Sequence, residues 1–374
     1  MNRLAALQLP GFAHRLYRKE IGCQTEPHLS SIPQATGIIL SMQTNTTFLP
    51  GLRVGHAQDD EALTGCTVIL CEAGAVGGVD QRGGAPGTRQ TDALTPMHLV
   101  DRVHAIVLSG GSAFGLDAAS GAVRYLEERG VGFDVRVARV PIVPSAILFD
   151  LGIGRSDIRP DAAMGYAACL NATTGYPAEG NVGAGAGATV GKILGIERAM
   201  KSGLGCARIE INASIIVVAI CAVNAFGDII SPSKGEIIAG ARKLDAAQPG
   251  ASPAEIFANT LDVMKSMAGQ TMTRFGRRED TVIGVVATNA ALTKEGVSKV
   301  AQMAQDGIAR TVRPAHTMLD GDTIFALSIG NEQADVNIIG AFAAEAFAQA
   351  VVRAVLTAQP AGGLPSVSSL AKAG

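Results

Sequence analysis

The chain has 374 residues, of which 47% are apolar and 17% are charged, and its formal net charge is −2. This composition is more apolar and less charged than that of an average globular protein, so we expect a large core of small aliphatic side chains. The sequence has no long basic or acidic run, which argues against nucleic acid and against an anionic membrane surface as partners.

The first 41 residues contain basic side chains but no sustained apolar stretch, so they make a poor signal peptide. We predict a poorly ordered extension over 1–41 and one domain over 42–374. The six cysteines lack metal-ligand spacing and are expected to be reduced thiols, which predicts a cytoplasmic protein. We recognise no run of about 18 apolar residues, so the sequence predicts no membrane span.

Strand-like and helical segments alternate along the first part of this domain. A strand and a glycine turn over 104–115 precede a helix over 116–130. A β-branched run over 209–224 predicts one or two buried strands. The segment SPAEIFANTLDVMKSMAG, which starts at Ser252, is expected to be the next helix. It opens with Ser252 and Glu255, which form a capping box around a proline at the first helical position.

The remaining segments continue the alternation. An exposed loop is predicted over 267–280, followed by a buried strand over 281–290 and an amphipathic helix over 294–312. A turn and strand follow over 320–330, and a long apolar helix over 334–359. The order of these elements indicates a mixed α/β protein, but not a dinucleotide-binding one.

The glycine-rich run NVGAGAGATVGK at 181–192 suggests a phosphate-binding loop at first sight. Such a loop requires a glycine at 186 and a serine or threonine after Lys192, but the chain has Ala186 and Ile193. Ser112 lacks the glycine spacing of a hydrolase nucleophile elbow. The histidines form no paired metal motif, so we expect neither a metal nor a cofactor.

Seven stretches, taken together and in order, resemble one family of proteins. They are similar to the self-processing aminopeptidases of the DmpA type, whose relatives include the nylon-oligomer (6-aminohexanoate oligomer) endohydrolases. The resemblance runs from about residue 48 to 357 and is nearer the endohydrolase branch. The stretches are PGLRVGHAQD (50–59), GGAPGTRQTD (83–92), LSGGSAFGLDAA (108–119), GAGAGATVGK (183–192), VNAFGD (223–228), TVIGVVATNAALTK (281–294) and HTMLDGDTIFAL (316–327).

The resemblance implies an N-terminal nucleophile hydrolase with an αββα four-layer sandwich, in which 42–374 is a single catalytic domain. The precursor would cut itself between Asp280 and Thr281, giving an α chain that ends at 280 and a β chain over 281–374. A threonine hydroxyl needs a base to become a good nucleophile. The new α-amine of Thr281 would be that base, because such amines have a pKa of about 7.7–8.0.

The resemblance also implies roles for four further residues. Lys192 would lie within hydrogen-bond reach of the nucleophile, where a cation keeps the amine neutral. The side-chain N–H of Asn224 would point at the developing oxyanion. Asp320 and Asp322 would orient the amine and hydroxyl of Thr281. The alternatives are a solvated lysine, an asparagine that satisfies buried backbone groups, and a simple turn at 320–322.

Two positions depart from the family pattern. The endohydrolases have asparagine before the cut where this chain has Asp280, although the acyl shift needs only the carbonyl. The aminopeptidases use a tyrosine near the site, and the corresponding region offers Phe149, which has no hydroxyl.

The expected function is hydrolysis of small peptides, amino-acid amides or aminohexanoate-type oligomers through an acyl-enzyme. The alternatives are an acyltransferase of the ornithine acetyltransferase type and an uncleaved, non-catalytic binding protein of the same fold. The low charge and the resemblance predict a homo-oligomer, specifically a tetramer. The close-packed glycines of 183–192 are expected to lie beside the strand that begins at Thr281.

Overall fold

The computed structural model describes residues 47–212, 214–243, 252–266 and 280–372, and residues 43–374 form one compact unit. The extension predicted over 1–41 lies outside the described residues, as does the predicted loop over 267–280 apart from Asp280.

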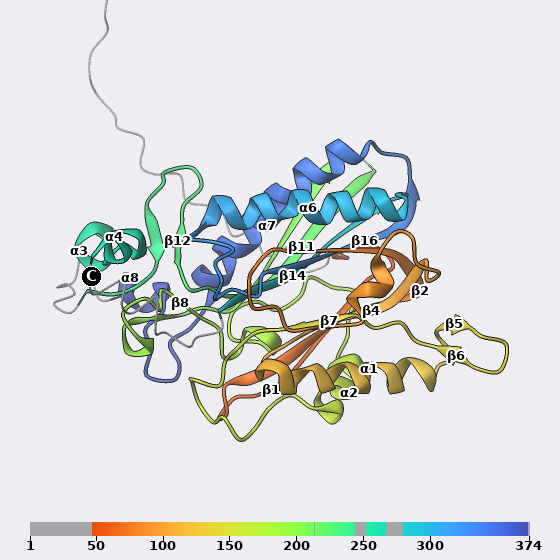
Figure 1. The fold of residues 1–374 in the computed structure, drawn as a ribbon, viewed down its shortest axis with the longest axis horizontal. Coiled ribbons are helices and arrows are strands. Elements are labelled where there is room, and N and C mark those ends of the chain that lie inside the picture. The colour runs from red at the N-terminus through yellow and green to blue at the C-terminus, as the bar shows by residue number, and fades with distance from the viewer. Residues whose placement is uncertain (1–46, 213, 244–251, 267–279, 373–374) are drawn as a thin grey trace, which may run out of the picture. The chain divides into compact units, whose positions relative to one another are not determined.

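A nine-stranded mixed sheet is the centre of this unit (Figure 1). β14 and β16 pair in parallel, as do β4 and β7, and the other neighbours are antiparallel. The strands in spatial order are β10 (Leu204–Ile211), β11 (Ile215–Asn224), β14 (Thr281–Ala290), β16 (Thr323–Glu332), β2 (Thr64–Gln81), β4 (Arg102–Ser109), β7 (Ser145–Ile147) and β3 (Thr88–Arg89), with β1 (Arg53–Asp59) paired to β2.

The long strand β2 joins two halves of this sheet. Its register against β4 shifts between Leu70 and Ala75, and Gly74 lies between them with a φ of +84°. The first part of β2 pairs with β1 and β4, whereas its last residues pair with β16. The halves can therefore pack face to face although their strands form one hydrogen-bonded path.

Helices cover both outer faces, and the four layers agree with the predicted αββα sandwich. In Figure 1, α6 and α7 lie on one side and α1 and α2 on the other. One apolar cluster lies under α6 and α7, one between the two sheet halves, and one under α1 and α2. They include Val286, Ala326 and Phe347; Ile106, Ile220 and Phe325; and Val107, Leu126 and Cys169, respectively. The α-helices are α1 (Ala118–Glu127), α2 (Ala162–Leu170), α3 (Pro253–Ile256), α4 (Thr260–Lys265), α6 (Lys294–Thr311), α7 (Val336–Thr357) and α8 (Val367–Lys372).

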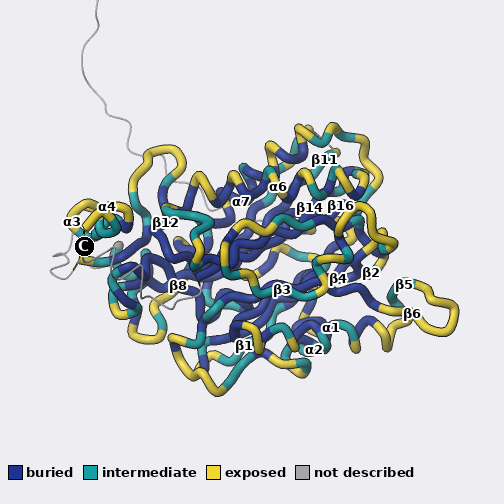
Figure 2. The backbone as a smooth tube through the Cα atoms, viewed as in Figure 1, coloured by how far each residue is buried: buried dark blue, intermediate teal, exposed yellow. Residues whose placement is uncertain are grey.

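Short elements complete the described fold. Three of them, β12, β13 and β15, form a separate small sheet, and two more pairs form hairpin-like ladders. The short strands are β5 (Phe133–Asp134), β6 (Arg139–Val140), β8 (Thr189–Val190), β9 (Met200–Lys201), β12 (Asp228–Ile230), β13 (Ile237–Ala239) and β15 (Val312–Arg313), and the 3-10 turns are η1 (Thr91–Leu94), η2 (Ser112–Asp117), η3 (Gly183–Gly185) and η4 (Ile196–Arg198). Figure 2 shows the main sheet as buried and the β5–β6 hairpin as exposed.

The capping box at Ser252 is present, but the helix that it opens is shorter than the sequence suggests. α3 ends at Ile256, and α4 begins after Asn259, whose φ is +52°. The amide of Ala258 donates to the carbonyl of Ala241 at 2.8 Å, so a tertiary contact replaces the helical one.

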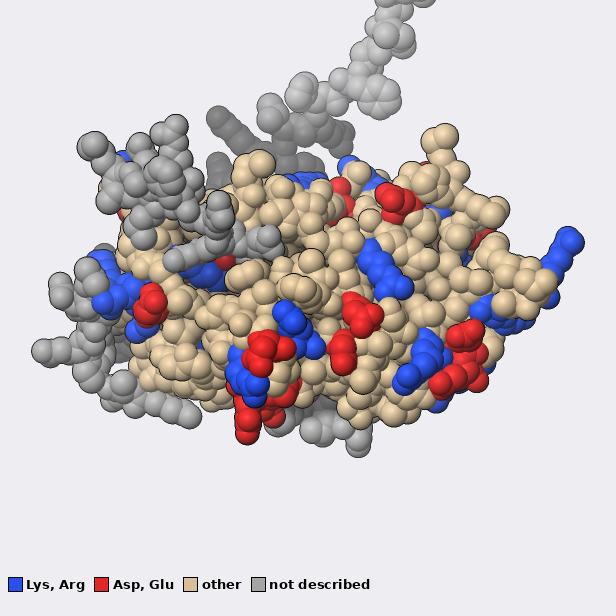
Figure 3. All heavy atoms as spheres, turned by 60° about the horizontal axis from the view of Figure 1, so that its bottom comes forward, with Lys and Arg blue, Asp and Glu red and all other residues tan. Residues whose placement is uncertain are grey.

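α7 corrects one expectation, because it has the length and hydropathy of a membrane-spanning helix. In this structure its apolar side chains pack in the core: Phe347 and Val351 are fully buried against the sheet. A helix that is apolar on most sides is typical of a large buried core as well as of a membrane. The face drawn in Figure 3 carries intermixed positive and negative side chains among mostly uncharged ones, with no extended patch of one sign.

Candidate active site

Thr281 is the first residue of β14 and is 2% exposed. The β-branched residues that follow it favour a strand, and they are buried on both faces, as expected for the middle of a sandwich. Thr281 is paired with Asn224 at the end of β11, and two residues later Ile283 is paired with Thr323 at the start of β16. Three strand ends therefore meet around Thr281.

The hydroxyl of Thr281 lies against the peptide bond that precedes it. Its Oγ1 donates to the carbonyl oxygen of Asp280 at 2.5 Å. The amide of Gly321 donates to the same carbonyl oxygen at 2.7 Å and lies 3.2 Å from Thr281 Oγ1. A backbone N–H therefore already faces the oxygen that would become negative if the hydroxyl attacked this carbonyl.

Gly321 is a candidate site residue that sequence reasoning missed. The DGD stretch drew attention to its two carboxylates, whereas the backbone amide between them makes the contact. A Cβ at Gly321 would lie 2.9 Å from Thr281 Oγ1 and 2.6 Å from the carbonyl oxygen of Ala85. Glycine is required here by close approach, and the glycine in the motif was the available signal.

Lys192 contacts the residue before Thr281. Its Nζ lies 2.6 Å from Asp280 Oδ1, 2.8 Å from Asn224 Oδ1 and 2.9 Å from the Asn224 carbonyl oxygen. The two charged side chains are 7% and 1% exposed, so this is a buried ion pair. Asp280 Oδ2 is also buried, and it has no hydrogen-bond partner among the described residues.

The backbone conformation and close packing of the glycine run place Lys192 at this position. Gly191 has a φ of +73°, and a Cβ there would lie 2.1 Å from the carbonyl carbon of Gly240. At Gly185 the same test meets the amide of Leu204 at 2.2 Å. The close approach expected for this run is present, but it is to these and other segments rather than to β14.

Asn224 holds the site together through both ends of its amide. Its Oδ1 accepts hydrogen bonds from Lys192 and from the amide of Thr189 at 3.0 Å. Its Nδ2 donates to the carbonyl of Phe149 at 2.8 Å. In the intact chain the N–H therefore faces Phe149, and its role toward an oxyanion stays a prediction.

Asp322 fixes the backbone on the far side of Thr281. Its Oδ1 accepts from the amide of Val282 at 2.8 Å. Its Oδ2 accepts from the amide of His316 at 3.1 Å and lies 2.9 Å from His316 Nδ1. His316 was not singled out from the sequence, although it opens one of the seven matching stretches. Its Nε2 is buried without a partner among the described residues.

Asp320 lies beside these groups, and its Oδ2 accepts from the amide and the hydroxyl of Thr317 at 2.8 and 2.6 Å. Burial first, and then the nearby carboxylates of Asp322 and Asp280, together raise the pKa of Asp320 to about 7. Like charges held close together in a buried site disfavour ionisation of one of them. The structure thus brings all six predicted residues into one cluster.

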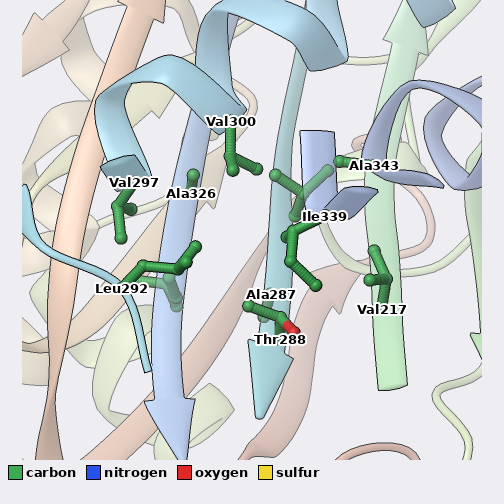
Figure 4. Close-up of a pocket in the computed structure, with 11 residues that line it drawn as sticks. Val217, Ala287, Thr288, Leu292, Val297, Val300, Ala326, Ile339 and Ala343 are labelled. Carbon is green, nitrogen blue, oxygen red and sulfur yellow. The ribbon is translucent and has the colours of Figure 1, made fainter. Parts of the chain in front are cut away.

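An apolar pocket lies elsewhere in the fold (Figure 4). It is lined by side chains from α6, α7 and the central strands, including Val300, Ile339 and Ala287. Thr288 is also part of its wall, near the opposite end of β14 from Thr281. Across the part of the chain that the structure describes, no group of three His, Cys, Asp or Glu residues is arranged to hold a metal ion.

Comparison with known proteins identifies relatives over most of the chain. Residues 45–367 match the model of peptidase family S58. An uncharacterized aminopeptidase of Mycobacterium tuberculosis strain H37Rv is 42% identical over 345 residues, which cover 86% of this chain and 96% of that protein. The 6-aminohexanoate-oligomer endohydrolase of Kocuria sp. strain KY2 is 31% identical over 320 residues, covering 82% of this chain and 84% of that one.

Two solved structures share the fold. The L-aminopeptidase D-Ala-esterase/amidase of Ochrobactrum anthropi, described as a variant of the Ntn hydrolase fold, aligns with a TM-score of 0.62 at 18% identity, covering 85% of this chain and 88% of its own. A Burkholderia sp. beta-aminopeptidase aligns with a TM-score of 0.60 at 19% identity, covering 87% and 91%.

Proposed function

Because the chain belongs to peptidase family S58, and is thereby a peptide or amide hydrolase, we propose that it cuts itself between Asp280 and Thr281 and then uses Thr281 as its nucleophile. The observation that carries this proposal is the hydrogen bond from the Gly321 amide to the Asp280 carbonyl oxygen at 2.7 Å. A donor in that position stabilises the charge that the first chemical step creates.

In the first step, Thr281 Oγ1 attacks the carbonyl carbon of Asp280. The carbonyl oxygen becomes an oxyanion beside the Gly321 amide, and collapse breaks the peptide C–N bond. The acyl group of Asp280 is then an ester on Thr281, whose nitrogen has taken up the proton lost by the hydroxyl and is a free amine. Water hydrolyses this ester and releases Asp280 as a chain end.

In the second stage, the amine of Thr281 accepts the proton of its own hydroxyl while that oxygen attacks an amide substrate. An α-amine with a pKa of about 7.7–8.0 is suited to this exchange near neutral pH. Asp322 supports the geometry because it holds the amide of Val282, the next residue along β14. Substrate hydrolysis then passes through the same kind of Thr281 ester.

The proposal is tested by intact-mass analysis and a denaturing gel of the purified protein, with amide hydrolysis measured on the same sample. Wild-type protein should give a fragment that begins at Thr281. Thr281→Ala should stay intact and inactive, whereas Thr281→Ser should still be cut. Thr288→Ala is the matched control, because Thr288 lies on the same strand and its hydroxyl donates to Ile216. Cleavage in Thr281→Ala, or a wild-type chain that stays whole, would contradict the proposal.

A further inference from the structure

Asp280 is held at three points, each of which belongs to a different part of its acyl unit. Its amide donates to the carbonyl of Leu319 at 2.8 Å, and its own carbonyl accepts from Gly321 at 2.7 Å. Its carboxylate lies 2.6 Å from Lys192 Nζ. The residue is 1% exposed, so the protein surrounds its amide nitrogen, its carbonyl and its side chain together.

The ester formed in the proposed self-cleavage is chemically similar to the ester that a substrate would form. After the acyl shift, Asp280 is esterified to the hydroxyl of Thr281, and the amine of Thr281 is free. An acyl-enzyme formed from an aspartyl amide substrate has the same ester and the same free amine. The contacts that hold Asp280 therefore indicate which acyl group the site binds when it forms its first ester on Thr281.

We propose that the mature site prefers amides of an aspartyl group, that is, an acyl unit with an amine on its α-carbon and a carboxylate on its β-carbon. This inference rests on the proposed function and names its substrate class. Once Asp280 has left, the substrate's α-amine donates to Leu319, its carbonyl accepts from Gly321, and its β-carboxylate pairs with Lys192. Attack by Thr281 breaks the substrate C–N bond, the leaving amine takes the proton, and water releases aspartate.

Lys192 is the residue that would distinguish the side chain of the substrate's acyl unit. Two oxygen atoms of Asn224 hold its ammonium group in place, at 2.8 and 2.9 Å, so the cation is fixed before the substrate arrives. Charge-assisted hydrogen bonds are about twice as strong as neutral ones, so a carboxylate is favoured over an isosteric amide. The buried carboxylates of Asp320 and Asp322, on either side of Gly321, favour a cationic α-amine nearby.

The test compares aspartyl, asparaginyl and alanyl p-nitroanilides on protein whose β chain has been shown by mass to begin at Thr281. We expect kcat/KM for the aspartyl substrate to exceed that for the asparaginyl one by about tenfold or more. In Lys192→Gln that ratio should fall to about one or below. The ratio is taken within one variant, so a general loss of rate does not affect it. Lys299→Gln, which changes an exposed lysine, should leave the ratio unchanged.

The outcomes separate the two proposals. Equal or faster hydrolysis of the asparaginyl or alanyl substrate overturns the aspartyl preference and leaves the hydrolase standing. An unchanged ratio in Lys192→Gln overturns the role of Lys192. If the cut protein hydrolyses none of the three, calorimetry with L-aspartate and L-asparagine still tests the acyl site, and equal affinities overturn it. A wild-type chain that stays uncut overturns both proposals.

Discussion

The amide of Gly321 lies 2.7 Å from the carbonyl oxygen of Asp280, which belongs to the peptide bond that we propose is cut. This donor belongs to a backbone that is itself fixed: the amide of Ala85 donates to the carbonyl of Asp320, and Asp322 binds Val282. In the proposed reaction, the oxyanion would therefore form next to a donor that the backbone already holds in place, rather than next to a mobile side chain.

Substitution of Gly321 by alanine should block or strongly slow cleavage. The added Cβ would lie 2.6 Å from the Ala85 carbonyl oxygen and 2.9 Å from Thr281 Oγ1, so the amide must shift away from Asp280. Loss of one oxyanion donor costs about 100–1,000-fold in rate. The fraction of intact chain with time measures this effect. Gly175→Ala is the control, because the nearest atom to its Cβ would be 4.0 Å away, and it should be processed normally.

The buried pair of Lys192 and Asp280 should show strong coupling in a double-mutant cycle made in the uncleavable Thr281→Ala chain. Lys192→Met alone leaves the Asp280 carboxylate buried without its cation, which costs about 3–5 kcal/mol in the free energy of unfolding. Adding Asp280→Asn removes that charge and should restore most of the loss.

Urea denaturation of the four proteins measures the coupling. The matched comparison is the exposed pair of Lys265 and Asp262, 3.0 Å apart, where far smaller coupling is expected. Additive effects at Lys192 and Asp280 would show that the pair is not a buried ion pair in solution.

Asp320 should make the stability of the intact chain depend on pH. Burial and the neighbouring carboxylates raise its pKa from 3.8 to about 7, so the folded state binds this proton more tightly than the unfolded state does. The stabilising contribution is complete below the unfolded pKa and is lost as pH rises from about 4 to about 7. Because the amide of asparagine does not ionise, Asp320→Asn should flatten this part of the profile.

The measurement is the free energy of unfolding against pH for Thr281→Ala with and without Asp320→Asn. Subtracting one profile from the other removes the contribution of groups that titrate alike in both proteins. A difference that does not change between pH 4 and 7 would mean that Asp320 is ionised in the fold at its ordinary pKa.

Asp322→Asn should slow processing while the chain still folds. Both carboxylate oxygens accept from backbone or side-chain N–H groups, at Val282 and at His316, and an amide nitrogen at either position would face a donor. An unmet buried group of this kind costs about 1–3 kcal/mol. We expect at least a tenfold slower cleavage in a time course, against unchanged cleavage in the exposed control Asp157→Asn. Cleavage at the parent rate would remove Asp322 from the machinery.

The sequence predicted the residues of this site better than their contacts. The β-branched run that starts at Thr281 marked a buried strand, and the family resemblance placed Lys192, Asn224 and the two aspartates near it. It did not predict that Lys192 meets Asp280, because the distance between two residues 88 positions apart depends on the turn at Gly191 and its packing on Gly240. The sequence also did not predict the direction in which the Asn224 side-chain amide points.

The helix boundaries show the same difference between what local sequence determines and what tertiary contacts determine. The capping box correctly marked the start of α3, since its hydrogen bonds are local. The end of α3 was missed because a tertiary contact, the amide of Ala258 on the carbonyl of Ala241, interrupts the helix. The four layers were predicted from the resemblance. The bend in β2 that allows these layers to form depends on a register shift, which no local sequence pattern predicts.

The position of β14 between β11 and β16 has a consequence for the order of folding and cleavage. Cleavage at Thr281 would place the new chain end in the middle of a sheet, with the later segment contributing β14, β16, α6 and α7 to its core. Separating the two pieces would expose both sides of that core, so they would stay interleaved. Folding must then be finished while the chain is whole, and the severed enzyme would be maintained by a barrier to unfolding rather than by its ability to assemble again.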